Sequence, residues 1–432
     1  MMAGQFTRRD TLKTALVAGA GYWTGVAGAV RAETPNEKLN VAVIGIGGQG
    51  RSNLNGLSSQ NIVALCDLDE VRAGDAFQKF PKATRFQDYR EMFDKMSNQI
   101  DAVAVSTPDH THFHPAMTAL QLSKHLYCEK PMAHSVWEIR QMTDLAAKQG
   151  VATQLGVQRH TLKNMHRVVE LIQAGAIGKV SEVHCWVEGK RGMPAMPAAE
   201  PVPDHVNWDL WIGPAQPREF SSTICPYGWR FWWDYGTGEM GNWGCHILDI
   251  PYWALGLKTP QYVEASGPPV DELRTPQSMA VKYVFEASDE QPAVDLHWYH
   301  AENGPDILRE LKLSNKGNNT LFIGSEGMLL CGFGQRKLLP EEKFANYTTP
   351  GESIPDSPGF HREFINACKG GEKATCDFSY SGPLSETVIL GNVAYRAGSG
   401  FKWNSADLAV IANAAAEKLI KPTFRKGWEF TL

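Results

Sequence analysis

The sequence lacks the cysteine spacings that build zinc or redox sites. Eight cysteines are spread over 432 residues, and no two of them form a C-x-x-C pair. This pattern excludes the common zinc-binding motifs, and we interpret most of these cysteines as core thiols. Spacing alone does not decide whether any two of them form a disulfide. We expect no metal site in this chain.

The chain also has no excess of basic over acidic residues. The chain has 42 Lys and Arg against 47 Asp and Glu, a formal net charge of -5. Residues 1–32 hold four basic side chains and one acid, so the remainder is more acidic still. Proteins that bind nucleic acid usually carry a basic surface, so we expect no nucleic-acid partner. The 43% apolar content is sufficient for two packed domains.

Long apolar runs are absent after residue 30. Before it, Arg8 and Arg9 precede an Ala- and Gly-rich run from Thr14 to Val30, followed by small residues suited to cleavage near Ala32. This pattern resembles a bacterial twin-arginine (Tat) signal peptide, which we assign to residues 1–32. The expected partner is the Tat export machinery, and the expected location is the periplasm. An uncleaved anchor is the alternative, since about 17 residues is the lower limit for crossing a bilayer.

Glycines at 45, 47 and 50 follow an apolar stretch that begins near Asn40. In a dinucleotide-binding turn the first glycine permits a tight turn and the second lets the backbone approach a pyrophosphate. The third lets a helix pack closely on a strand. A second apolar stretch ends at Asp67. Asp67 follows the glycines by about 20 residues, which is the sequence separation at which dinucleotide-binding proteins carry the acid that binds a ribose. We therefore predict that the cofactor-binding residues here are Gly45, Ile46, Gly47, Gly50 and Asp67. The alternative is a glycine-rich turn in an unrelated α/β protein.

Asp67 favours NAD as the cofactor, because an acid at this position hydrogen-bonds a free ribose hydroxyl. Arg51 and Arg72 keep NADP open, since either could reach a 2′-phosphate.

Strand and helix patterns alternate up to about residue 158. We predict an α/β fold in which an N-terminal Rossmann parallel sheet, residues 37–158, precedes an α+β domain with a large, mostly antiparallel open sheet, residues 159–432. The second domain would bind substrate and form oligomer contacts, and its tail would pack back on the first. Its expected strands are 180–187, 261–266, 279–286, 293–300, 309–314 and 319–331. Its expected helices are 160–174, 359–369 and 383–397.

Polar residues follow three of the predicted parallel strands at their carboxyl ends, where doubly wound sheets bind ligands. The first group is Thr107, Pro108 and His110, and the second is Glu129 and Lys130. We predict that these five contact the cofactor. The third group comprises Gln158, Arg159 and His160, which would bind substrate or else act as hinge or cap residues. A solvated surface lysine is the alternative for Lys130.

Seven tryptophans crowd into residues 208–253. Flat apolar rings beside polar groups suit the faces and hydroxyls of sugars, and we take Trp233 as a substrate-binding candidate. A hydrophobic core or an oligomer interface is the alternative for most of these rings.

The chain resembles the Gfo/Idh/MocA family of glucose-fructose oxidoreductase and inositol dehydrogenase. The resemblance rests on the glycine turn, on Glu129-Lys130-Pro131 and on the segment 241–249, and it covers essentially the whole mature chain. It implies that Lys130 and His246 are catalytic and that Asp249 binds substrate. The family also has an aspartate where this chain has Asn242. Family members commonly associate through the open sheet, so a homodimer or homotetramer is expected.

On one helix, Asn242, His246 and Asp249 would fall at i, i+4 and i+7 and share a face. A histidine is well suited to accept the hydroxyl proton of an alcohol near neutral pH. Asn242 can only hydrogen-bond, so His246 should be less basic than in relatives that carry the acid. A buried structural histidine is the alternative for His246.

These features predict an NAD(P)-dependent oxidoreductase that acts on a carbohydrate or polyol hydroxyl. Free NAD should be scarce outside the cytoplasm, so we expect a tightly bound, internally recycled cofactor. The first alternative is a glycoside hydrolase or lyase that oxidises its sugar transiently with bound NAD. The second is a non-catalytic sugar-binding protein, which the missing aspartate at position 242 keeps open.

Overall fold

A computed structural model describes residues 37–287, 292–301 and 304–430. The expected signal peptide, residues 1–32, lies outside the described residues. The described residues from Lys38 onward belong to one compact unit. Within this part of the chain no helix combines the length and the apolarity that a bilayer crossing requires.

The first sheet is parallel and has the order β3-β2-β1-β4-β5-β6. Its strands are β1 (Asn40–Ile44), β2 (Asn61–Cys66), β3 (Thr84–Phe86), β4 (Ala102–Val105), β5 (His125–Cys128) and β6 (Thr153–Leu155). The predicted parallel sheet is confirmed. The short β3 was not predicted, because Thr-Arg-Phe has no apolar run. The strand order reverses between β1 and β4, which creates a crevice at their carboxyl ends.

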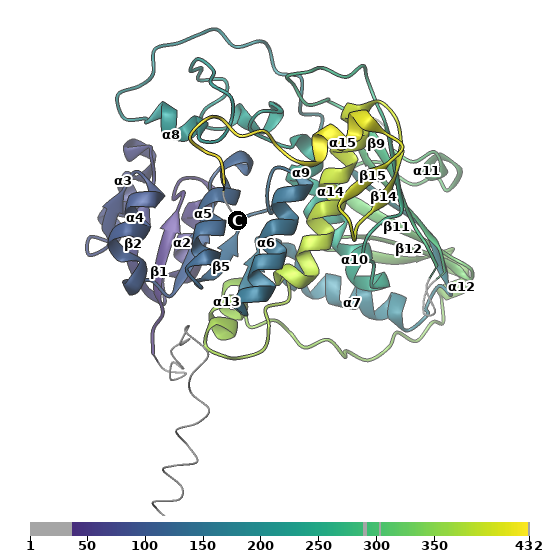
Figure 1. Ribbon diagram of the computed structural model, residues 1–432. Coiled ribbons are helices and arrows are strands. Elements are labelled where there is room, and N and C mark those ends of the chain that lie inside the picture. Colours follow the sequence, from purple (N-terminus) through teal and green to yellow (C-terminus); the bar gives the residue numbers. More distant parts are fainter. Residues whose placement is uncertain (1–36, 288–291, 302–303, 431–432) are drawn as a thin grey trace, which may run out of the picture. The chain divides into compact units, whose positions relative to one another are not determined.

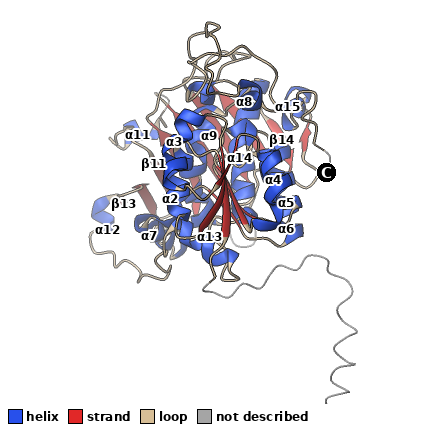
Figure 2. Ribbon diagram, turned by 90° about the vertical axis from the view of Figure 1, so that its left-hand side faces the viewer, coloured by secondary structure: helices blue, strands red, loops and turns tan. Residues whose placement is uncertain are grey.

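Helices cover this sheet (Figure 2). They are α2 (Gln49–Leu57), α3 (Glu70–Lys79), α4 (Tyr89–Met96), α5 (Phe113–Gln121) and α6 (Val136–Gln149). Local sequence sets their ends. The Asp69 side chain accepts hydrogen bonds from the N–H groups of Val71 and Arg72 and so begins α3. Ser135 and Glu138 form a capping box that begins α6.

The second sheet has the order β13-β12-β11-β7-β10-β9-β8-β14-β15. Its strands are β7 (Val180–Val187), β8 (Tyr262–Ser266), β9 (Met279–Phe285), β10 (Val294–His300), β11 (Asn319–Gly324), β12 (Gly327–Gly332), β13 (Arg336–Leu339), β14 (Phe401–Asn404) and β15 (Ala409–Ile411). Among the described strands β7 and β10 pair in parallel, and the other pairs are antiparallel. The predicted mostly antiparallel sheet is therefore confirmed.

Two strand predictions need correction. Residues 309–314 form no strand, because α11 (Ile307–Glu310) and the turn after it pack their leucines against Trp186 and Leu321 on the sheet. Residues 319–331 form two strands, because the chain reverses between Gly324 and Gly327 to make the β11–β12 hairpin.

The remaining helices are α7 (Lys163–Gln173), α8 (Trp208–Ile212), α9 (Gly238–Ile247), α10 (Asp249–Leu255), α12 (Glu341–Phe344), α13 (Phe360–Cys368), α14 (Phe378–Ala397) and α15 (Ala414–Ile420). Helix α14 lies beside α6 of the first domain and also packs on β8 and β9 (Figure 1). Arg140 on α6 and Glu386 on α14 form an ion pair of 2.7 Å, which links the two domains. The C-terminal tail also returns to the first domain, where Phe424 and Phe430 pack on Phe113.

Candidate active site

A cavity of about 490 Å³ lies at the carboxyl ends of the parallel strands. The first domain contributes the glycine turn, the ends of β2 and β4, and Lys130. The second domain contributes Asn242 and His246 from α9. The cavity is therefore enclosed by both domains and contains groups suited both to bind a cofactor and to transfer a proton.

The glycine turn has the geometry that a bound pyrophosphate requires. Gly45 has φ of +77°, and a β-carbon there would lie 2.8 Å from the backbone of Ser106. A β-carbon at Gly50 would lie 1.8 Å from the carbonyl oxygen of Gly45, so helix α2 could not pack as closely. Gly45 and Gly47 line the cavity. These positions fit the turn that brings backbone and helix N–H groups to a phosphate.

Asp67 follows β2 and also lines the cavity. Its carboxylate accepts hydrogen bonds from the N–H groups of Ile46, at 2.8 Å, and Asp69, at 3.0 Å. Burial raises the pKa of Asp67, and the two backbone hydrogen bonds partly oppose this. Ile46 does not line the cavity and instead anchors Asp67 through its backbone N–H. The carboxylate thus has a fixed orientation with lone pairs left for a ribose hydroxyl.

The two arginines near the turn differ in position. Arg72 lines the cavity, and a β-carbon at Gly47 would lie 3.4 Å from its guanidinium group. Arg51 donates instead to the backbone oxygens of Ile46 and Arg72. Arg72 is therefore the arginine positioned to meet a phosphate.

The residues after β4 only partly follow the prediction. Thr107 and Pro108 line the cavity. His110 does not, because its ring is buried between the backbone oxygens of Tyr235, at 3.2 Å, and Trp211, at 3.0 Å. Burial lowers its pKa to about 3, so the ring is neutral. His112 lines the cavity in its place; no spacing in the sequence distinguishes these two histidines.

Lys130 and Asn242 contact each other across the domain boundary. The Lys130 ammonium donates to the backbone oxygen of Asn242 at 2.9 Å and to its Oδ1 at 3.4 Å. The Asn242 amide N–H in turn donates to Glu239, one turn earlier on α9. Glu239 is buried and pairs with Arg191. The amide of Asn242 is therefore held with its oxygen toward Lys130, an arrangement that the sequence did not reveal because Arg191 is distant in the chain.

His246 lies one helical turn after Asn242 and lines the same cavity. Burial lowers the pKa of its imidazole well below the usual value, and the charges of Lys130 and Arg159 lower it further. Its Nδ1 is buried without a hydrogen-bond partner among the described residues. The imidazole is thus neutral near pH 7 and able to accept a proton.

Glu129 is a buried carboxylate at the floor of the cavity. Its Oε1 accepts hydrogen bonds from Asn53 at 2.9 Å, Gln158 at 2.8 Å and Tyr127 at 3.3 Å. Gln158 also lines the cavity, as predicted for a ligand-facing residue, although its amide is directed to Glu129. This network positions the backbone that precedes Lys130.

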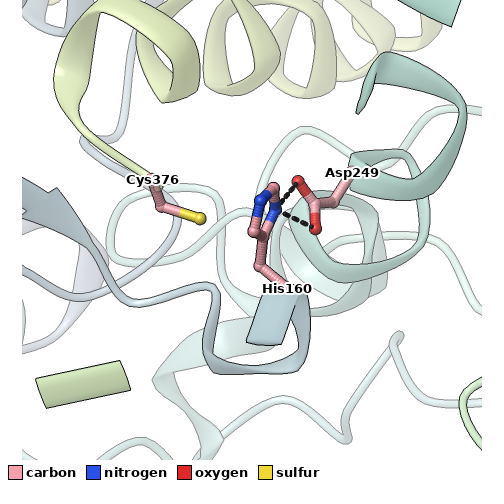
Figure 3. A group of neighbouring side chains, drawn as sticks. All are labelled: His160, Asp249 and Cys376. Atoms are coloured by element: carbon pink, nitrogen blue, oxygen red, sulfur yellow. Dashed lines mark hydrogen bonds and ion pairs between the residues drawn. The ribbon is translucent and has the colours of Figure 1, made fainter. Parts of the chain in front are cut away.

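The prediction that Asp249 shares a helix face with His246 is wrong. Helix α9 ends at Ile247 and a separate helix, α10, begins at Asp249. The Asp249 carboxylate contacts Nδ1 of His160 at 3.0 Å and accepts a 2.6 Å hydrogen bond from Tyr380. Cys376 lies on the other side of the His160 ring (Figure 3). Neither Asp249 nor His160 lines the cavity, and their cluster is buried in the second domain.

Two further substrate candidates also lie outside the cavity. The guanidinium group of Arg159 stacks over the rings of Phe333 and Trp243. Trp233 is buried, and its indole N–H donates to the backbone of Asp271. The tyrosine and tryptophan rings that do line the cavity are Tyr89, Trp211, Tyr227, Trp229 and Trp428. The tryptophan-rich segment 208–253 thus supplies two of the rings that line the cavity, Trp211 and Trp229. Trp428 belongs to the C-terminal tail, which the tertiary structure brings to the cavity.

The fold and the cavity define a two-domain dinucleotide-binding α/β protein. The chain belongs to the Gfo/Idh/MocA oxidoreductase family. Residues 39–157 match the family's NAD-binding Rossmann fold, and residues 177–430 match its C-terminal alpha/beta domain.

Similar proteins include dehydrogenases and a glycosidase. An inositol 2-dehydrogenase from Salmonella typhimurium is 28% identical over 152 residues, 34% of this chain and 45% of the relative. A glycosyl hydrolase family 109 protein from Solibacter usitatus is 29% identical over 209 residues, 40% of this chain and 44% of that protein. The chain therefore matches less than half the length of these relatives.

A solved structure shares the fold. The WlbA dehydrogenase from Bordetella pertussis, in complex with NADH and UDP-GlcNAcA, superimposes with a TM-score of 0.61 at 15% identity. The match covers 85% of this chain and 99% of that one.

Proposed function

We propose that this chain is an NAD-dependent oxidoreductase that acts on a CH–OH group of a carbohydrate or polyol. The observation that carries the proposal is the single cavity that holds the glycine turn, Lys130 and His246. NAD, when bound, would accept the hydride that leaves the alcohol carbon. The inositol 2-dehydrogenases among the relatives support a polyol or sugar as the substrate class.

The side chains of the cavity would move the hydroxyl proton and position the substrate oxygen. The neutral imidazole of His246 accepts the hydroxyl proton of the substrate. The Lys130 ammonium donates a hydrogen bond to the substrate oxygen, and Asn242 keeps that ammonium at the cavity. Protonated His246 would lie near two positive charges, those of Lys130 and Arg159, which favours release of the proton after each turnover.

We also propose that the chain keeps its cofactor bound throughout the reaction cycle. The Asp67 carboxylate supports NAD, while Arg72 at the glycine turn is the residue that would accommodate NADP. A Tat signal peptide at residues 1–32 would export the folded chain to the periplasm, and the bound cofactor would travel with it and be recycled in place. The open face of the second sheet is the proposed contact in a homodimer or homotetramer.

A second candidate function is redox-assisted glycoside cleavage, which the family 109 relative favours. In that scheme bound NAD would take hydride from one sugar carbon as its hydroxyl proton leaves, giving a ketone. The ketone acidifies the neighbouring C–H, and loss of that proton expels the glycosidic oxygen. Water would then add to the resulting double bond, and the ketone would be reduced again, so the cleavage would leave no net NADH.

The decisive experiment compares wild type with Lys130→Met, His246→Asn and the exposed control Lys163→Met. Each protein is denatured and its supernatant is scanned for released dinucleotide. Each is also assayed with a sugar and polyol panel for nicotinamide absorbance and with nitrophenyl glycosides for aryl alcohol release. We expect both site variants to retain dinucleotide and to lose activity by about 10²- to 10⁴-fold.

The outcomes separate the candidate functions. Net NADH formation supports the oxidoreductase, and aryl alcohol release without NADH supports the hydrolase. Site variants as active as Lys163→Met would contradict both. Sugar binding without either reaction in wild type would indicate a non-catalytic binding protein.

A further inference from the structure

Two histidines and a glutamate meet on the second sheet, away from the dinucleotide cavity. Glu182 and His184 lie on β7, and His297 lies on β10 directly opposite His184. The two imidazole rings stack with centroids 4.8 Å apart. Ligand atoms of all three residues lie within 4.8 Å of one another. We propose that this cluster binds a first-row divalent transition metal ion of the zinc class.

The distances fit such an ion. Zinc lies about 2.0–2.2 Å from imidazole nitrogen and carboxylate oxygen, so neighbouring ligands of a tetrahedral site are about 3.3–3.5 Å apart. The Oε1 of Glu182 is 3.0 Å from Nε2 of His184 and 3.6 Å from Nε2 of His297. The two rings are stacked, so both would have to turn for their Nε2 lone pairs to point at one ion beside the Glu182 carboxylate.

The donor set determines the class of ion. Two imidazoles and one carboxylate suit zinc and related first-row metals, whereas calcium and magnesium prefer oxygen ligands. Nδ1 of His184 is 3.2 Å from the Tyr299 hydroxyl, whose oxygen can accept a hydrogen bond from Nδ1–H when Nε2 binds a metal.

The surrounding charges also favour a cation. Glu182 and Asp295 place two carboxylates at the cluster, and Lys282, the neighbouring base, pairs with Asp295 at 2.7 Å. On the neighbouring strand β11, Ile323 lies opposite Glu182 and Leu321 lies opposite His184. Neither side chain has a polar group that could hydrogen-bond to the proposed ligands. In the single chain the Glu182 side chain is 42% exposed, and in the proposed oligomer this face of the sheet would lie at the subunit contact.

The cluster also has a structural consequence. Strands β7 and β10 are the parallel pair in this otherwise antiparallel sheet, among the strands described. A metal held by both strands would link them and stabilise the native state by mass action. No sequence spacing predicted this site, because His297 is more than 110 residues from His184.

The test uses the full chain without a polyhistidine tag, treated with a chelator and then titrated with zinc by calorimetry. We expect saturable binding of one ion per chain and an unfolding temperature that rises with zinc. Glu182→Gln, His184→Gln and His297→Asn should each weaken binding by about tenfold or more. Cobalt added in place of zinc should give ligand-field absorption in wild type that His297→Asn loses, with far-ultraviolet circular dichroism unchanged.

Two control variants make the test specific. Glu264→Gln removes the same charge from the same face of the sheet and should leave zinc affinity unchanged. Cys376→Ala removes a donor from the other buried His/Asp/Cys cluster and should also leave it unchanged. Absence of saturable binding would overturn the proposal, as would binding that persists in His297→Asn or is lost in Cys376→Ala.

Discussion

The ammonium group of Lys130 lies 2.9 Å from the backbone oxygen of Asn242 and 3.4 Å from its side-chain oxygen. This contact joins the end of a Rossmann strand to a helix of the second domain. It holds the lysine with an uncharged partner, the amide of Asn242. The charge balance of the cavity therefore depends on residue 242.

Asn242→Asp tests this dependence. A carboxylate at 242 would stabilise protonated His246 and Lys130, so the pH–rate profile of kcat/KM should move to higher pH. The new charge would also face the Glu239 carboxylate, which now accepts from the Asn242 amide at 3.3 Å. We expect a loss of about 1–3 kcal/mol in the free energy of unfolding, measured in urea. An unchanged pH profile would show that residue 242 is not coupled to the base.

Arg159→Met tests the electrostatic environment of His246. The Arg159 charge lowers the pKa of His246 although Arg159 does not line the cavity. Its removal should shift the acid limb of kcat/KM to higher pH, by less than about one unit, because the imidazolium becomes easier to form. The exposed variant Arg309→Met should leave the limb in place. A large rise in KM without a shift would instead indicate that Arg159 contacts substrate.

Glu138 should make stability depend on pH. Burial raises its pKa to about 7, above the value of about 4.3 expected in the unfolded chain. The native state therefore binds the proton more readily, and stability falls as pH rises between these two values, by up to about 3 kcal/mol. Glu138→Gln keeps acceptor and donor groups in the capping box and should flatten this part of the curve. Urea unfolding at about pH 5 and 8 measures the difference; parallel curves would contradict the prediction.

Gly50→Ala and Gly74→Ala form a matched pair in neighbouring helices. A β-carbon at Gly50 would overlap the Gly45 carbonyl, whereas one at Gly74 meets nothing within 4 Å. We expect Gly50→Ala to cost at least about 3 kcal/mol of stability and to abolish dinucleotide retention. Gly74→Ala should stabilise α3 by about 0.5–1 kcal/mol with the dinucleotide kept. Thermal unfolding and released-dinucleotide assays would measure both; equal effects would contradict the assignment of the turn.

The glycine turn could be predicted because its requirements are local. Gly45, Gly50 and Asp67 belong to one strand–helix–strand unit, and backbone sterics fix their roles. Lys130 could be placed in the same way, since it follows the end of a recognisable strand. The interrupted helix at Leu248 could not, because the sequence keeps helical spacing through it while the backbone ends one helix and begins another.

The sequence alone determined the Rossmann unit, the mostly antiparallel second sheet and the approach of Lys130 to the cofactor edge, because period, glycine placement and strand ends act over short distances. The tertiary structure decided which side chains share the cavity. It buried His110, His160 and Trp233, brought His112 and Trp428 to the cavity, and tied Asn242 to Glu239. Those outcomes depend on how elements far apart in the chain pack together, and burial and charge pairing are properties of that packing.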